Sequence, residues 1–329
     1  MTIIIYGKKI AEQIEKQVAL KITKIKESCG KIPTLAVILV GENPASQIYV
    51  RNKKKKAESL GINSFDVILD SNITQEKLLE EIKKLNNDKN VHGILLQLPL
   101  TKHLNTLEAI MAINPLKDVD GFHPENVGLL NIGNPRFIPC TPKGCVKLIK
   151  TVQEDLSGLH ALIIGRSNVV GWPVTKLLLN EHCTVNVGHS KTKNLGKLSK
   201  DADIIIVAAG CENLLAEDMI SDEKSIIIDV GINRYINDLG ESKIRGDVDF
   251  NNLSKKARAI TPVPGGVGPM TIACLMENVL MAYELLENKE YFKANHYLSF
   301  LGICCAPKAA FLLRSFCFVS TVCGTSCSS

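Results

Sequence analysis

The sequence predicts an α/β fold with two α/β domains flanking a cleft, the second of them a Rossmann-like parallel sheet. Apolar runs rich in β-branched residues alternate along the chain with amphipathic stretches of helical period. Continuous apolar strands separated by helices are typical of parallel sheets covered on both faces. A long connection rich in Gly, Pro and Asn, residues 114–144, follows the third run and divides the chain into two halves.

Seven strands are predicted, three before this connection and four after it. They cover residues 34–41, 65–70 and 91–100 in the first half, and 161–165, 184–188, 202–210 and 225–231 in the second. A final helix over 271–286 is expected to return to the first half. The predicted domains are therefore 1–140 with 268–295, then 141–267, followed by a tail, 296–329.

Composition limits the class of protein. The 329 residues are 45% apolar and 22% charged, an ordinary globular balance, and the net charge of +5 is spread over many residues. This favours solubility over a nucleic-acid footprint, so no nucleic-acid partner is expected. The N-terminus lacks the pattern of an export signal, and no apolar run approaches the roughly 18 residues of a spanning helix. A cytoplasmic protein without membrane insertion is predicted.

The tail differs in composition from the rest of the chain. It holds five of the eleven cysteines, and Pro307, Lys308 and Arg314 interrupt its apolar runs. Neither these cysteines nor the six scattered upstream have the spacing of a metal site, so reduced thiols and no metal are expected. We interpret the tail as an appendage.

Four consecutive lysines, 53–56, lie in a predicted helix. Asn43 is its candidate N-cap, Pro44 occupies the first position and Gly61 ends it. At about 100° per residue, Lys53 falls beside Tyr49 on the packed side.

The same projection leaves Lys56 turned partly toward that side and directs Arg51, Lys54 and Lys55 toward solvent. Because a buried unpaired charge is costly, Lys53 needs either a path to water for its ammonium or a polar partner. Both alternatives stay open from this segment alone.

Two polar residues near strand ends are candidates for such a partner. Gln97 closes an apolar strand that Pro99 ends, and Asp120 lies in the loop KDVDG, where a ligand crevice is usual in open α/β folds. An amide satisfied by backbone and a carboxylate that caps a turn are the alternative interpretations.

The second half carries a strand, turn and helix of the kind that binds dinucleotides. The turn GRSNVVG keeps Gly165 but has Arg166 and Ser167 in place of the usual pattern. The following strand leads into GHSKT, which has no acid to bind a ribose hydroxyl. Ser190 and Arg166 can instead bind a 2′-phosphate, which favours NADP over NAD.

A loop with three prolines and three glycines, TPVPGGVGPMT, precedes the final helix. Its adjacent glycines allow a close approach of backbone to a ligand, and its prolines stiffen it.

The segments YVRNKKKKAESLGI, GILLQLPLT, NPLKDVDGFHPENVGLL, PCTPKG, GRSNVVGWP, DVGINR, GDVDF and TPVPGGVGPMT, in this order, resemble the bifunctional methylenetetrahydrofolate dehydrogenase/cyclohydrolase family. The resemblance runs from about residue 4 to about residue 290. It implies NADP-dependent oxidation of 5,10-methylenetetrahydrofolate to the methenyl form, hydrolysis to 10-formyltetrahydrofolate, a homodimer, and a place in the one-carbon supply of purine biosynthesis.

The resemblance also implies the roles of individual residues. Lys53 resembles the catalytic lysine, Gln97 the amide that holds it, Tyr49 the aromatic that stacks on folate, and Asp120 the carboxylate that binds the pterin ring. Gly165, Arg166 and Ser167 resemble the NADP turn, with Ser190 near the 2′-phosphate and Ile232 near the nicotinamide; Pro264, Gly265 and Gly266 resemble the loop that closes on folate.

Two other functions remain to be weighed against this one. The first is a related Rossmann dehydrogenase that acts on a different small molecule, such as a shikimate-type or amino-acid-type substrate. The second is a nucleic-acid-binding module that uses the lysine run. The Tyr49, Lys53, Gln97 and Asp120 set argues against the first, and the division of the lysines between two helix faces argues against the second.

Overall fold

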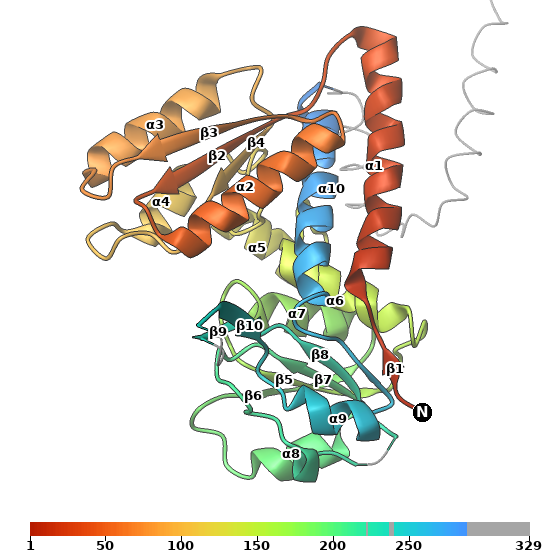
Figure 1. Cartoon of the computed structure of the whole chain (residues 1–329). Helices are drawn as coiled ribbons and strands as arrows, with labels where there is room; N and C mark the ends of the chain where they lie inside the picture. Colours follow the sequence, from red (N-terminus) through yellow and green to blue (C-terminus); the bar gives the residue numbers. More distant parts are fainter. Residues whose placement is uncertain (222, 237–239, 288–329) are drawn as a thin grey trace, which may run out of the picture. The chain divides into compact units, whose positions relative to one another are not determined.

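The structure is a computed structural model that describes residues 1–221, 223–236 and 240–287. The helices and strands lie in one unit, residues 1–284, with the last turn of the final helix extending beyond it (Figure 1). The predicted tail, 296–329, lies outside the described residues, so its interpretation as an appendage stays a prediction.

The first three predicted strands form a parallel sheet in the order β3-β2-β4. The central strand β2 is buried along its whole length because it is covered on both faces. The elements of this lobe are β2 (Thr34–Val40), α2 (Pro44–Ser59), β3 (Asn63–Leu69), α3 (Gln75–Asn87), β4 (Gly93–Leu96) and α4 (Thr106–Ala112).

Helices cover both faces of this sheet. Alternate β2 residues, from Ala36 to Val40, pack with the apolar sides of α3 and α4 in one core cluster. The helix α2 contacts β2 and β3 on the other face (Figure 1). From this face of the sheet, Lys53 of α2 reaches Gln97, the residue that follows β4.

The second lobe is built on six parallel strands in the order β1-β11-β8-β7-β5-β6. All four predicted strands are present, while β1 and β11 were not predicted because each has only two residues. Ile3 and Ile5 donate to the carbonyls of Arg258 and Ile260 at 3.0 and 2.8 Å. The chain thus starts in the second sheet, although the first domain was predicted from residue 1. The strands are β1 (Ile3–Ile4), β5 (His160–Ile164), β6 (Thr184–Gly188), β7 (Ile204–Val207), β8 (Ile226–Asp229) and β11 (Ala259–Ile260).

The strand order reverses at β5, since β6 lies on one side of it and β7 on the other. Ligands of open α/β sheets bind at such a reversal, outside the carboxyl ends of the strands. The surrounding helices are α6 (Cys140–Lys150), α7 (Gly171–Asn180), α8 (Leu195–Asp201), the short 3₁₀ helix η1 (Glu217–Met219) and α9 (Phe250–Lys256).

Three helices and a hairpin complete the described chain. They are α1 (Gly7–Cys29), α5 (Pro124–Asn131), α10 (Val267–Glu287), and the antiparallel pair β9 (Asn233–Ile236) and β10 (Ser242–Arg245). The helix α10 begins four residues before its predicted start, inside the glycine-rich motif. It is long and apolar enough to cross a membrane, but 56% of its apolar window is buried, and buried core helices pass the same test.

Candidate active site

The local sequence around α2 forms the helix as predicted. The Asn43 side chain accepts hydrogen bonds from the N–H groups of Ala45 and Ser46 at 3.0 and 3.2 Å. Pro44 takes the first position, and Gly61 follows the helix with φ of +82°. The Asn43 contacts satisfy two of the free amides at the start of α2 and mark where the helix begins.

Lys53 belongs to the buried side of α2 and has a polar partner. Only 8% of the residue is exposed, and its Nζ donates to Gln97 Oε1 at 3.0 Å. The Gln97 Nε2 donates in turn to the carbonyl of Leu98 at 2.7 Å, which leaves Oε1 free to face the lysine. Of the two alternatives left by the sequence, a partnered lysine is the one that the structure contains.

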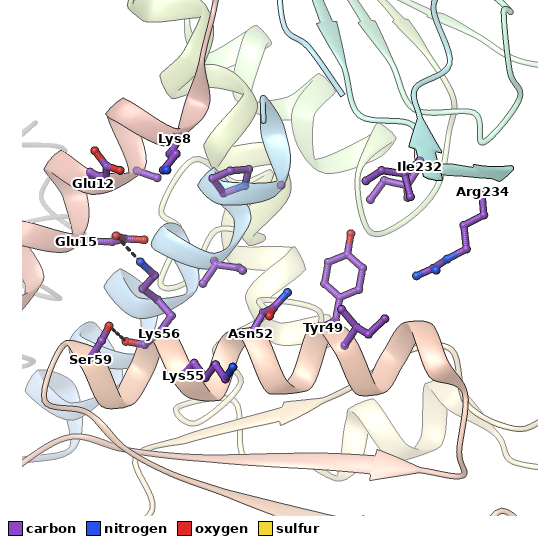
Figure 2. A pocket seen from close by; sticks show the side chains of 16 residues that line it. Lys8, Glu12, Glu15, Tyr49, Asn52, Lys55, Lys56, Ser59, Ile232 and Arg234 are labelled. Carbon is purple, nitrogen blue, oxygen red and sulfur yellow. Dashed lines mark hydrogen bonds and ion pairs between the residues drawn. The ribbon is translucent and has the colours of Figure 1, made fainter. Parts of the chain in front are cut away.

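The other lysines of the run have different surroundings. Lys56 forms a 2.8 Å ion pair with Glu15 of α1 (Figure 2), and Lys55 is exposed as predicted. The prediction that Lys54 is solvated is wrong, because β3 runs beside that face of α2. Its Nζ lies 3.3 Å from Asp66 Oδ2 of β3, in a half-buried pair.

The loop KDVDG is anchored by its first two charged residues. Lys117 donates to three carbonyls at the end of α3, those of residues 85, 86 and 88, at 2.7 to 3.0 Å. Asp118 Oδ2 accepts from the His123 N–H and from Asn126 Nδ2, each at 2.8 Å. Both residues are buried and partnered, so they hold the loop in place.

Asp120 differs from its neighbours in this loop. Within the described ranges no hydrogen bond to its carboxylate is present, and it lines a cavity of about 190 Å³ together with Lys53 and Gln97. Burial raises the pKa of Asp120 to about 6, with Lys53 opposing the shift and Asp118 adding to it. A carboxylate without a protein donor, facing a cavity, is available to a ligand.

Tyr49 lies between two larger cavities. It lines a cavity of about 700 Å³, which extends along α2, and one of about 300 Å³ beside the proline- and glycine-rich loop. Figure 2 shows its ring extending from α2 toward Ile232 and Arg234. Burial raises the pKa of the Tyr49 hydroxyl, partly offset by Arg234, so the phenol stays neutral at physiological pH.

The proline- and glycine-rich loop forms a wall of the 300 Å³ cavity through Pro264, Gly265 and Gly266. Gly265 has φ of +110°, which favours glycine, and a Cβ at Gly266 would lie 2.7 Å from the carbonyl oxygen of Pro262. A Cβ at Gly7 would lie 2.0 Å from the carbonyl oxygen of Gly266. The start of α1 therefore packs directly on this loop.

The turn after β5 has the geometry of a phosphate site. Gly165 has φ of +128°, and a Cβ there would lie 2.3 Å from the carbonyl oxygen of Ala208 at the end of β7. Ser167 Oγ accepts from the N–H groups of Val170 and Gly171 at 3.2 and 3.4 Å. In the part of the chain that the structure describes, the N–H groups of residues 166–169 make no hydrogen bond. These free amides fit an anionic ligand such as a dinucleotide pyrophosphate.

The predicted 2′-phosphate residues lie at one sheet edge. Arg166 and Ser190 are exposed and follow the neighbouring strands β5 and β6. Ile232, expected near the nicotinamide, lies just before β9 and lines both of the Tyr49 cavities.

Sequence reasoning assigned no role to several residues at the site. Thr141 and Thr271 line the small cavity, and their hydroxyl oxygens lie 2.9 Å apart. Asp229 and Asp247 are buried beside the second sheet. All four residues lie in the motifs PCTPKG, DVGINR, GDVDF and TPVPGGVGPMT, but a motif does not show which of its side chains are buried.

A sheet with this strand order and an amide-rich turn at its reversal defines a dinucleotide-binding enzyme, and the polar cavity beside α2 supplies a reaction centre next to it. The class is a two-lobed α/β oxidoreductase. Models of the tetrahydrofolate dehydrogenase/cyclohydrolase family match residues 5–120 as its catalytic domain and residues 139–287 as its NAD(P)-binding domain. The chain belongs to this family.

Curated and solved relatives agree with this assignment. The bifunctional protein FolD of a Wolbachia strain from Drosophila simulans is 52% identical over 283 residues, which is 86% of this chain and 95% of the relative. The crystal structure of the bifunctional FolD enzyme from Campylobacter jejuni is 50% identical, with a TM-score of 0.82 over 86% of this chain and 99% of that one. The Trypanosoma brucei enzyme, solved with NADP and an inhibitor, is 35% identical, with a TM-score of 0.84 over 87% and 99%.

The predicted fold class, family and enzyme class are thereby confirmed. The protein is a bifunctional methylenetetrahydrofolate dehydrogenase and methenyltetrahydrofolate cyclohydrolase. A dehydrogenase for a different small molecule, which the sequence had left as an alternative, is set aside.

Proposed function

We propose that both reactions take place at the cavity lined by Lys53, Gln97 and Asp120. The observation that carries this proposal is the 3.0 Å hydrogen bond from Lys53 to Gln97 on a cavity that also exposes a carboxylate without a protein donor. Oxidation converts 5,10-methylenetetrahydrofolate to the methenyl cation, and water then opens that cation to 10-formyltetrahydrofolate.

Asp120 binds the pterin end of the substrate. An ionised carboxylate accepts two parallel N–H bonds from an aminopyrimidine edge, and no group among the described residues competes for its oxygens. Tyr49, at the border of the larger cavities, offers an aromatic face to the rest of the folate. Together the two side chains support a folate that extends from the small cavity toward Ile232.

Lys53 assists proton transfer in the hydrolytic step. Water adds to the methenyl carbon, one C–N bond breaks, and one proton is released in total. A lysine ammonium has three N–H groups; one is donated to Gln97, and the described residues offer no acceptor to the other two. They are available to water or to a folate nitrogen, while the neutral Gln97 amide fixes the lysine without adding charge.

The second lobe binds NADP in preference to NAD. In this proposal the free amides of residues 166–169 receive the pyrophosphate, and the exposed Arg166 and Ser190 bind the 2′-phosphate. NADP held there would supply the acceptor for the hydride that leaves the methylene carbon. The chain itself contributes alignment of the two molecules, through the walls that Ile232 and the Pro264–Gly266 loop form beside Tyr49.

The test is an assay of both products in one preparation. Wild-type enzyme supplied with methylenetetrahydrofolate and NADP should form the methenyl and formyl compounds in sequence. Lys53→Ala should reduce cyclohydrolase turnover by about a hundredfold or more while NADP still binds, since the cofactor residues belong to the other lobe. Full cyclohydrolase activity in this variant, with loss in Lys56→Ala, would transfer the role to Lys56.

The remaining expectations concern the cellular setting. We propose a homodimer, a cytoplasmic location and a contribution of 10-formyltetrahydrofolate to purine biosynthesis. Family membership supports the tetrahydrofolate substrates, and sedimentation of the purified chain would test the dimer.

A further inference from the structure

The hairpin that carries Ile232 and Arg234 is fixed at both ends by buried carboxylates. It leaves the second sheet after Asp229, the last residue of β8, and returns to the side of that sheet at Asp247, two residues after β10. Asp229 is 2% exposed and Asp247 is fully buried. Asp229 also lines the 300 Å³ cavity at the base of the hairpin, but none of the folate and phosphate contacts proposed above uses either carboxylate, so these buried charges need another explanation.

Asp229 binds both ends of the hairpin. Its Oδ1 accepts from the N–H groups of Gly231 and Asp247 at 3.1 and 2.9 Å, and its Oδ2 accepts from the N–H of Val248 at 3.3 Å. The Asp229 N–H donates to the hydroxyl of Thr261 at 2.8 Å. One side chain thus joins the departing and the returning strand. Burial raises its pKa to about 7 in spite of these donors, and the neighbouring Asp247 carboxylate adds to the shift.

Asp247 connects the hairpin to the carboxyl end of β7. Its Oδ2 accepts from the N–H groups of Ala209 and Gly210, each at 2.8 Å, next to the dinucleotide turn. Its Oδ1 accepts from Asn233 Nδ2 at 2.8 Å, and the same amide donates to the carbonyl of Gly246 at 2.9 Å. The start of β9 is therefore tied to the sheet edge where the strand order reverses.

Two glycines let the carboxylates interlock. A Cβ at Gly231 would lie 2.1 Å from Asp247 Cγ, and a Cβ at Gly246 would lie 1.7 Å from Asp229 Oδ2. Both distances are far below van der Waals contact, so any side chain at either glycine would displace a carboxylate. The Asp247 carboxylate thus fills the space beside Gly231, and the Asp229 carboxylate fills the space beside Gly246.

We propose that Asp229 and Asp247 are positioning residues for the dehydrogenase step, acting through the hairpin that they fix. Ile232 follows Gly231 directly and Arg234 follows Asn233, and both line the cavity that Tyr49 shares (Figure 2). The inference rests on the proposed function, in which Ile232 borders the nicotinamide.

The cyclohydrolase group is supported by different elements. Lys53 belongs to α2, Gln97 follows β4, and Asp120 lies in the loop before α5. Among the described residues, no hydrogen bond joins these three side chains to the two carboxylates. Displacement of the hairpin should therefore slow the dehydrogenase reaction and leave the cyclohydrolase reaction unchanged.

The decisive experiment measures both activities of the same full-length preparation. Both oxygens of Asp247 accept hydrogen bonds from N–H donors. In Asp247→Asn an NH₂ group replaces one of these oxygens and faces an N–H donor, so that hydrogen bond is lost. We expect the dehydrogenase kcat to fall about tenfold or more while cyclohydrolase turnover stays within about twofold. Gly246→Ala, which displaces Asp229 by a different route, should shift the ratio of activities in the same direction. Asp249→Asn, which changes the half-buried N-cap of α9 in the same segment, is the matched control and should leave the ratio unchanged.

Equal loss of both activities in Asp247→Asn and Gly246→Ala, or no loss in either, would overturn the inference. If Asp247→Asn does not fold, Asn233→Ala removes only the bonds to Asp247 and Gly246, and a fall of about threefold in the ratio is then expected. A wild-type enzyme without dehydrogenase activity would instead refute the proposed function, so the two failures are distinguishable.

Discussion

Asp120→Asn should stabilise the folded protein while removing folate binding. The pKa of Asp120 is about 6 in the folded chain, against an ordinary value of about 3.9. Because the folded state holds the proton more tightly, stability falls as pH rises between about 4 and 6, and it stays reduced above pH 6. Asparagine cannot ionise and escapes this loss.

The size of the effect follows from the shift. Two pKa units correspond to about 3 kcal/mol, and because the residue is partly exposed toward the cavity, solvent reduces this to about 1–3 kcal/mol. Urea unfolding followed by circular dichroism at pH 7.5 should show the gain, and it should shrink toward zero as the pH approaches 4. Both turnover rates should fall at pH 7.5, since an amide presents one acceptor where the carboxylate presents two.

Asp155 provides a control, because its pKa is shifted in the direction opposite to that of Asp120. The N–H of Ser157 lowers the pKa of the exposed Asp155, so Asp155→Asn should give no gain at pH 7.5. If Asp120→Asn were no more stable than wild type at pH 7.5, or equally more stable at every pH, burial would not be the cause of the shift and the linkage argument would be wrong.

Three further outcomes are expected. Arg166→Ala should lower kcat/KM for NADP more than for NAD, because only NADP loses a charge-assisted contact; equal losses in steady-state assays would contradict this. Lys54→Ala should reduce the unfolding free energy by about 1 kcal/mol because it leaves the half-buried Asp66 without its ion pair, whereas Lys55→Ala should change it by less than about 0.3 kcal/mol. Lys54→Ala and Lys55→Ala should each change turnover less than about threefold. Deletion of 300–329 should preserve both activities, and a marked fall in the thermal unfolding midpoint would make the tail part of the core.

The sequence predicted the long, well-bounded elements and missed the short ones. The helix α2 was placed correctly because Asn43, Pro44 and Gly61 mark its ends chemically. The strands β1 and β11 have two residues each, too few to show a period, and tertiary pairing alone defines them. The start of α10 was placed late because Gly268 and Pro269 suggest a loop, although proline is tolerated in the first turn of a helix.

The site residues were predictable to the extent that helical geometry and motif order locate them. The angle between Lys53 and Lys55 on α2 separated the partnered lysine from the solvated one. It failed for Lys54, because projection of a single helix carries no information about β3 beside it. The pairing of Asp229 with Asp247 was equally inaccessible, since 18 residues separate them and only the sheet edge brings them together.

The contrast between Asp118 and Asp120 shows what distinguishes a binding group from a structural one in this protein. Both are acids of one five-residue loop, and burial raises the pKa of each. Asp118 accepts two hydrogen bonds at 2.8 Å, so its desolvation is offset within the chain. Asp120 receives none from the described residues and faces Lys53 across a cavity. Its carboxylate is therefore available to donors from a ligand, and in the proposed function the two N–H groups of a pterin edge supply them.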